Sequence, residues 1–139
     1  MKLEKKTISE IATTAYLAGL LDMKASITIE ARPDTKTRIL YYSTAFLVLH
    51  KEENVIDALI ETFGGLNTKK GAYYAWKITG RELESMLNRV IPFLFFKKNH
   101  AIIMIDFIKQ SQKNSVNLSD NQREQQKKLY IKLKELNKK

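Results

Sequence analysis

Tyr16-Leu17-Ala18-Gly19-Leu20-Leu21-Asp22-Met23-Lys24-Ala25-Ser26-Ile27 is the stretch that decides the fold, because an apolar helical segment passes into a strand-like segment with no turn between them. At Asp22 the apolar residues change from the helical period of 3.6 to strict alternation. The alternating part places Ile27, Ile29 and Ala31 on one face of a strand. The pattern therefore predicts a helix that ends near residue 22 and a strand over residues 25–32.

The predicted first helix carries small residues on one face. They are Ala12, Ala15, Ala18 and Gly19, at spacings of three or four. Residues at these spacings share a side of a helix, and small side chains there let another helix approach closely. Glycine inside a helix costs about 1 kcal/mol relative to alanine. We therefore expect Ala12, Ala15, Ala18 and Gly19 to form a helix–helix contact.

The rest of the chain predicts a regular order of elements. After a turn at residues 33–36 it indicates a second strand over 38–49, a helix over 52–63 stopped by Gly64-Gly65, and a hairpin of strands 66–69 and 72–79 around Lys70-Gly71. A short helix begins at residue 79 or 80, and Pro92 is predicted as an early residue of a helix that continues to about residue 110. A polar loop (110–117), a capping box that begins at Ser119 and a helix to about residue 137 complete the order.

Composition narrows the class of protein. The 139 residues fit one domain, and 24 Lys and Arg against 15 Asp and Glu give a net charge of +9 and a pI near 9.7, as expected of a polyanion binder. The absence of cysteine excludes disulfides and thiolate metal sites, and two histidines make a zinc site improbable. Apolar runs are short and no signal peptide is visible, so we expect no membrane contact and an intracellular location in cytoplasm, nucleoid or an organelle.

The segment Leu17–Ala25, followed by Ser26-Ile27, resembles the signature of the LAGLIDADG homing endonucleases. That signature is leucine, alanine, glycine, leucine, isoleucine, aspartate, alanine, aspartate, glycine, and six of its nine positions agree when Leu21 is counted as conservative. The resemblance continues in order through Ala45-Phe46, Phe63-Gly64-Gly65, Tyr74-Ala75-Trp76-Lys77-Ile78, Ile91-Pro92-Phe93-Leu94 and Lys97-Lys98. It covers about the first four fifths of the chain.

The resemblance implies an α+β fold of the αββαββα type, with an antiparallel DNA-facing sheet and extra C-terminal helices. We expect residues 1–110 to form the LAGLIDADG-like DNA-binding domain and residues 111–139 to form a polar loop and a basic helix packed on it. It also implies the family's association with introns or inteins. Because this chain carries only one copy of the motif, the resemblance implies a homodimer that pairs through the first helix.

The chain departs from the family at the second acidic position of the signature, where it has Lys24. The family uses that acid to bind the divalent metal that activates water against a DNA phosphate. A hard cation such as Mg²⁺ needs anionic or carbonyl oxygen, and lysine offers neither. The other family-matched catalytic positions are Asp22, which is mainly structural in the family, His50, which helps position water, and Lys97, which lies beside the scissile phosphates. We therefore expect no metal site and no cofactor.

Strand parity and the resemblance together predict the DNA-contacting side chains. Arg32 is suited to donate two hydrogen bonds to guanine and Glu30 to accept one from cytosine. A solvated sheet face is the alternative from the pattern alone. The predicted DNA-binding residues are Lys24, Thr28, Glu30, Arg32, Tyr41, Ser43, Lys69, Tyr73, Lys77, Lys97 and Lys98.

The leading hypothesis is a homodimeric, sequence-specific, double-stranded DNA-binding protein that is nuclease-deficient because of Lys24. One alternative is an active homing endonuclease that makes Mg²⁺-dependent double-strand breaks with another acid. A second alternative is a maturase that binds intron RNA, since the same basic sheet would serve RNA. All three need a polyanion partner, and the first two differ only at the end of the first helix.

Overall fold

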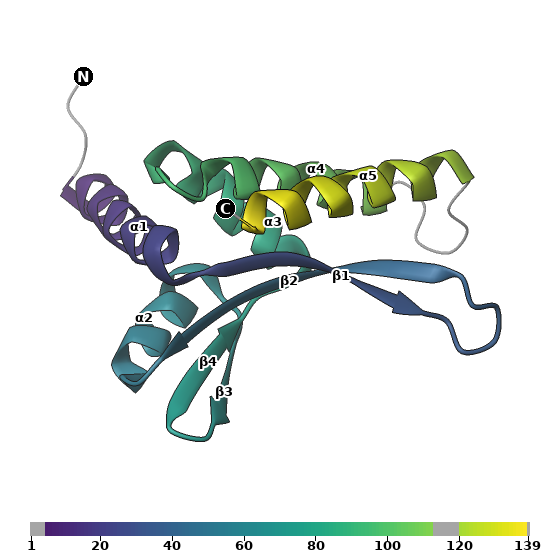
Figure 1. The fold of residues 1–139 in the computed structure, drawn as a ribbon. Helices are drawn as coiled ribbons and strands as arrows, with labels where there is room; N and C mark the ends of the chain where they lie inside the picture. Colours follow the sequence, from purple (N-terminus) through teal and green to yellow (C-terminus); the bar gives the residue numbers. More distant parts are fainter. Residues whose placement is uncertain (1–4, 113–119, 139) are drawn as a thin grey trace.

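The computed structural model describes residues 5–112 and 120–138. A four-stranded antiparallel sheet in the order β1-β2-β4-β3 has helices α4 and α5 on its upper side and an arched, open underside (Figure 1). In chain order the elements are α1 (Lys5–Lys24), β1 (Ser26–Pro33), β2 (Leu40–His50), α2 (Glu53–Phe63), β3 (Leu66–Lys70), β4 (Tyr73–Lys77), α3 (Gly80–Val90), the 3₁₀ turn η1 (Ile91–Phe93), α4 (Lys98–Gln112) and α5 (Asp120–Asn137). The predicted α+β fold is confirmed.

Register in the long β1–β2 hairpin separates a core face from an open face. Ile27 lies opposite Phe46, and Ile29 lies opposite Thr44, on the side covered by helices. The next residue in each strand points to the opposite face, because the side-chain period of a strand is two. The alternation therefore assigns the even positions of β1 and the odd positions of β2 to the open underside.

The core is anchored on Trp76, which is fully buried. Its indole Nε1 donates a 2.8 Å hydrogen bond to the carbonyl oxygen of Gly64. A Cβ on Gly65 would lie 2.5 Å from that same nitrogen, and the φ of Gly65 is +92°. The Gly64-Gly65 pair therefore ends α2 and also lets the chain approach the central strand closely.

Helix α5 packs on α4 and on β1. Leu133 is buried, the rings of Tyr130 and Tyr42 lie 5.2 Å apart, and Asn137 Nδ2 donates a 2.9 Å hydrogen bond to the carbonyl of Ile27. The predicted domain division at residue 110 stays a prediction. The predicted loop lies mostly in residues 113–119 and the predicted cap, Ser119, lies wholly there, outside the described residues.

The predicted helix from Pro92 to residue 110 was wrong at its start. Pro92 lies in the 3₁₀ turn η1, Leu94 is extended (φ −82°, ψ 140°), and α4 begins only at Lys98. The intervening segment is held by hydrogen bonds to Asp22, a residue more than seventy positions away. Long-range contacts of this kind leave no periodic signal in the local sequence.

The predicted placement of Lys69 on the open face was also wrong. The β3–β4 turn is Gly71-Ala72, one residue later than predicted, and Lys70 lies opposite Tyr73. Lys69 instead lies opposite Tyr74, with its Nζ 5.7 Å from the centre of that ring. With either turn Lys69 pairs with an even-numbered residue of the following strand, Ala72 for the predicted turn and Tyr74 in the structure. The prediction failed because a two-residue turn pairs odd-numbered residues of one strand with even-numbered residues of the other. Lys70 therefore takes the place predicted for Lys69.

Candidate nucleic-acid interface

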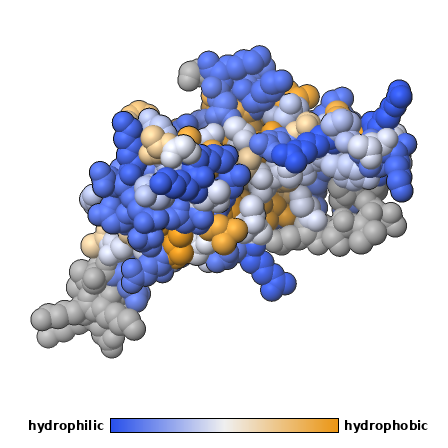
Figure 2. Space-filling view, turned by 90° about the horizontal axis from the view of Figure 1, so that it is seen from below, coloured by the Kyte–Doolittle hydropathy of each residue, from blue (hydrophilic) through white to orange (hydrophobic). Residues whose placement is uncertain are grey.

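The open underside of the sheet is largely hydrophilic, with hydrophobic areas among the polar ones (Figure 2). Its polar and charged side chains come from all four strands. By register they are Ser26, Thr28, Glu30, Arg32, Tyr41, Ser43, Thr68, Lys70, Tyr73 and Lys77. Apart from Lys69, every strand residue predicted to contact DNA therefore lies on this one face.

The far end of the β1–β2 hairpin carries hydrogen-bonding side chains. The guanidinium of Arg32 lies 3.2 Å from a carboxylate oxygen of Glu30, and the two side chains are 78% and 48% exposed. Ion pairs this exposed contribute about 0–1 kcal/mol, so this one can be exchanged for contacts with a ligand. Tyr41 and Ser43 lie opposite these residues on β2. This end offers both donors and acceptors to a base edge.

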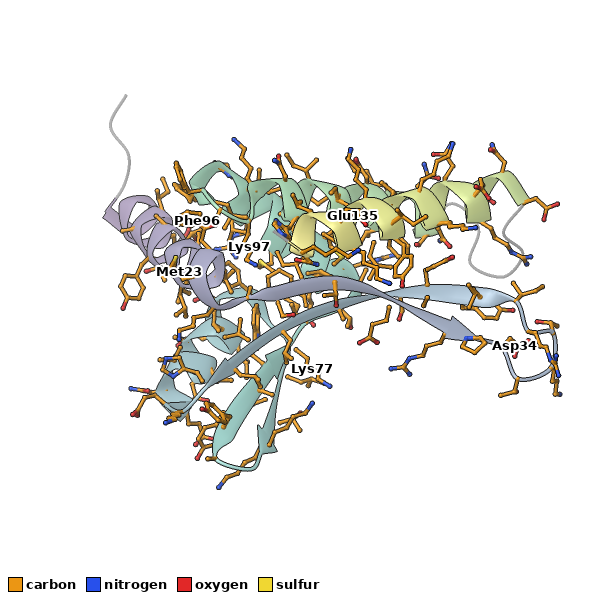
Figure 3. The ribbon with its side chains drawn as sticks, in the orientation of Figure 1. Met23, Asp34, Lys77, Phe96, Lys97 and Glu135 are labelled. Carbon is orange, nitrogen blue, oxygen red and sulfur yellow. The ribbon has the colours of Figure 1, made fainter. Side chains whose placement is uncertain are left out.

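Basic side chains also lie on the face and near the end of α1. Lys77 lies on β4 at the underside of the sheet (Figure 3). Lys24 and Lys98 are exposed and Lys97 is half-buried, all near the end of α1. Lys77 suits a polyanion that runs along the underside, and the three lysines near the end of α1 add to the positive charge of the protein.

Asp22, the first acid of the signature, is fixed by the backbone of the segment that precedes α4. One carboxylate oxygen accepts hydrogen bonds of 3.0 Å from the N–H groups of both Phe95 and Phe96, and the other accepts one of 2.7 Å from the N–H of Lys97. The residue is only 7% exposed. Asp22 therefore joins the end of α1 to the segment before α4 and sets the position of Lys97. Figure 3 shows Phe96 and Lys97 near Met23 at the end of α1.

The residues at this corner do not fit a divalent metal ion. In the described part of the chain no group of three His, Cys, Asp or Glu side chains is close enough to hold one. Lys24 stands at the end of α1 with an ammonium group, which repels cations, and the oxygens of Asp22 are engaged by three N–H groups. The arrangement can bind an anion such as a phosphate, but it offers no oxygen cage.

His50 lies at the end of β2 on the helix-covered side of the sheet. Its Nδ1 accepts a 3.0 Å hydrogen bond from the N–H of Glu52, which fixes the turn into α2. It also lines a cavity of about 240 Å³ together with Tyr16 and Leu20 of α1. His50 therefore lies away from the open face, and its predicted role in positioning water stays a prediction.

The outer face of α1 is apolar and uncovered. Ala12 and Gly19 are exposed and Ala15 is half-buried. Ala18 is fully buried in the core of its own chain, so its assignment to the dimer interface was wrong. The sequence reasoning missed Tyr16 and Met23, which are 79% and 69% exposed. The spacing 12, 16, 19, 23 places both on the same helix face as Ala12 and Gly19, and this signal was visible in the sequence.

Two further exposed aromatic residues lie beside the end of α1. Phe95 and Phe96 are 81% and 62% exposed, and their rings pack edge to face with centroids 5.0 Å apart. The hydrogen bonds to Asp22 hold them there. We call Ala12, Tyr16, Gly19, Met23, Phe95 and Phe96 the α1 face. Contiguous exposed apolar patches of this kind mark protein–protein contacts.

We predict that the folded state loses stability as the pH is lowered, because His100 is buried at the start of α4. Burial, and then the charge of Lys97, lower the pKa of His100 below its usual value of 6.5. The unfolded chain therefore binds a proton before the folded one does, so stability is lost as the pH falls below 6.5 towards the folded pKa. Urea unfolding at pH 7.5 and 5.5 should show a larger loss for the natural protein than for His100→Gln. Equal losses would contradict this role of His100.

The described helices include none long and apolar enough to cross a membrane. No protein-family model and no curated protein matches the chain in sequence. Solved structures do match in fold. The homing endonuclease I-CvuI, in complex with DNA, has a TM-score of 0.82 at 16% identity over 92% of this chain and 83% of its own.

Two further homing endonucleases give the same result. The archaeal intron-encoded I-Vdi141I, complexed with DNA, has a TM-score of 0.81 at 17% identity, covering 91% of this chain and 85% of its own. I-TnaI has a TM-score of 0.66 at 16% identity, covering 99% and 96%. The chain therefore has the fold of the homing endonucleases, as the LAGLIDADG resemblance predicted.

Proposed function

We propose that this protein is a homodimer that binds double-stranded DNA sequence-specifically through the open underside of its sheet and does not cut it. The end of α1 carries the proposal. Lys24 occupies the position where the resemblance expects a metal-binding acid, and Asp22 is engaged by three backbone N–H groups. Lys24 and Lys97 can attract a phosphate here, but they cannot lower the pKa of a metal-bound water.

Charge and shape support DNA as the partner. The net charge of +9 is accompanied by lysines on the underside and near the end of α1. A two-stranded β-ribbon fits the major groove, where each base pair presents a distinct pattern of donors and acceptors. The β1–β2 hairpin supplies such a ribbon, with Arg32 and Glu30 at its far end. I-CvuI and I-Vdi141I, which share this fold, are complexed with DNA in their structures.

The α1 face supports a homodimer. A two-fold axis beside α1 would pair the face with itself and remove Tyr16, Met23 and Phe95 from water. The same axis would place two sheets along one duplex, as other two-fold DNA readers do. I-SmaMI, which shares this fold, is a longer chain, and in one match this protein covers only 42% of it.

Selection of a target from a randomised duplex library, followed by incubation with Mg²⁺ or Mn²⁺, tests the proposal. We expect a recovered consensus site, tight binding in the absence of metal and intact strands. Efficient and specific double-strand cleavage by the unmodified protein would favour the active endonuclease instead. Preference for structured RNA in a competition experiment would favour the RNA-binding alternative.

We predict that affinity for the selected duplex falls steeply with salt. Each phosphate contact releases a counterion, so a dimer that makes about six contacts should lose about a thousandfold in affinity between 50 and 200 mM salt. The slope of log K against log salt concentration measures the number of contacts, and Lys77→Gln should make it less steep. Ser85→Gln on the exposed side of α3 is the control and should leave the slope unchanged. A flat plot would contradict a phosphate-dominated interface.

A further inference from the structure

The centre of the open underside holds an apolar patch that the DNA-binding prediction did not include. Leu66 on β3 is 72% exposed and Leu49 on β2 is 43% exposed, while Leu47 is half-buried. In register, Leu47 and Leu66 flank Lys77, and Leu49 lies beside Ala75 in the next row. Leu47 and Leu49 are neighbours on the same face of β2, two residues apart, and Leu66 lies in the row of Leu47 across Lys77, so the three leucines surround the Lys77 position. We call Leu47, Leu49 and Leu66 the leucine patch.

We propose that the leucine patch contacts the C5-methyl groups of thymines in the major groove, and so makes this protein select thymines there. This inference rests on the proposed function. Thymine's methyl is the one apolar group that an unmodified base presents in that groove. A leucine placed against any other base edge would leave donors or acceptors unpaired, which is costly.

Charge argues against a protein as the occupant of the patch. Lys77 stands between Leu47 and Leu66 on the same face, so an apolar partner that covered the leucines would also cover its ammonium group. A buried charge without a partner is strongly unfavourable. Duplex DNA avoids this cost, because its phosphates can pair with Lys77 while thymine methyls contact the leucines.

Strand geometry predicts where in the target the thymines lie. Leu47 pairs with Ser26, which is two residues beyond the end of α1, and Arg32 pairs with Tyr41 near the tip of the hairpin. Six residues of β2 separate the two rows, or about 20 Å at about 3.4 Å per residue. That length matches about six base pairs of duplex. The thymines should therefore lie nearer the dimer centre, about six base pairs from the base that Arg32 contacts.

Replacement of thymine by deoxyuridine in the selected target tests the inference, because it removes only the methyl group. Substitution at the inner positions should weaken binding about fourfold per methyl. The same substitution at outer positions of the half-site is the control and should change little. Leu49→Ser, which removes the apolar side chain at this exposed position, should reduce the difference between thymine and deoxyuridine and relax selection for thymine.

The outcomes separate this inference from the proposed function. If the inner positions hold no thymine, or if deoxyuridine binds as tightly as thymine while salt-sensitive duplex binding remains, the leucine patch does not act on methyl groups and the proposed function stands. If the protein assembles in the absence of DNA and Leu66→Thr prevents this, the patch binds protein and the inference is wrong. If no duplex binds at all, both fail.

Discussion

The unmodified protein should bind its selected duplex equally well with and without Mg²⁺ and leave both strands intact. Two copies of Lys24 meet near the centre of the proposed dimer, and their ammonium groups stabilise a bound phosphate but repel a cation. Lys24→Asp, combined with Ala25→Gly as in the family's signature, should introduce Mg²⁺-dependent binding. We expect at least about a tenfold rise in affinity on adding Mg²⁺, or about 1.4 kcal/mol, and strand cleavage that the natural protein lacks.

Matched variants separate the acid from the loss of charge. Lys24→Gln with Ala25→Gly removes the ammonium group without adding a metal ligand, so it should show neither Mg²⁺-dependent binding nor cleavage. Ala25→Gly alone controls for a change in the core, because Ala25 is only 5% exposed. Binding assays and gel analysis of end-labelled duplex measure the two effects. Specific cleavage by the natural protein at the rate of the Asp variant would overturn the nuclease-deficient proposal.

Sequence periodicity was sufficient for the order of elements and for the face that each strand of the β1–β2 hairpin presents. Ile27 and Ile29 alternate with Thr28 and Glu30, and this alternation survives in the structure because one face is covered by helices and the other is open. The family resemblance supplied what periodicity does not carry, namely the hypotheses of a DNA partner and of a role for position 24.

Three features escaped prediction for physical reasons. The link between Asp22 and residues 95–97 is a long-range contact, so no local pattern records it. Lys69 was predicted on the same face as the odd-numbered residues Tyr73 and Lys77, but a two-residue turn pairs it with even-numbered residues such as Tyr74. The leucine patch was missed because mixed strands were interpreted only by their polar residues.

Gly19→Leu should convert the dimer into a folded monomer. Apart from the backbone of α1 itself, nothing lies within 4 Å of the position that a Cβ on Gly19 would take, so a side chain can leave the helix there without a clash. Leucine also has a higher helix propensity than glycine, by roughly 0.8 kcal/mol, so the monomer should unfold at a slightly higher temperature. Two closely packed helices have axes only about 8–10 Å apart, and there leucine would collide with the partner.

Loss of the dimer should reduce affinity for the full target by about 10²–10⁴, because the second half-site no longer binds as part of one linked molecule. Binding to an isolated half-site should be unchanged, since Gly19 lies on the α1 face and not on the open underside of the sheet. Sedimentation measures the oligomeric state of the natural protein and of Gly19→Leu. The control is Ser85→Leu, which adds a leucine to the exposed side of α3 and should leave the dimer intact. A natural protein that stays monomeric at every accessible concentration, and also when bound to DNA, would show that α1 is not a dimer interface. In that case a partner other than a second copy of this chain would have to cover Tyr16, Met23 and Phe95.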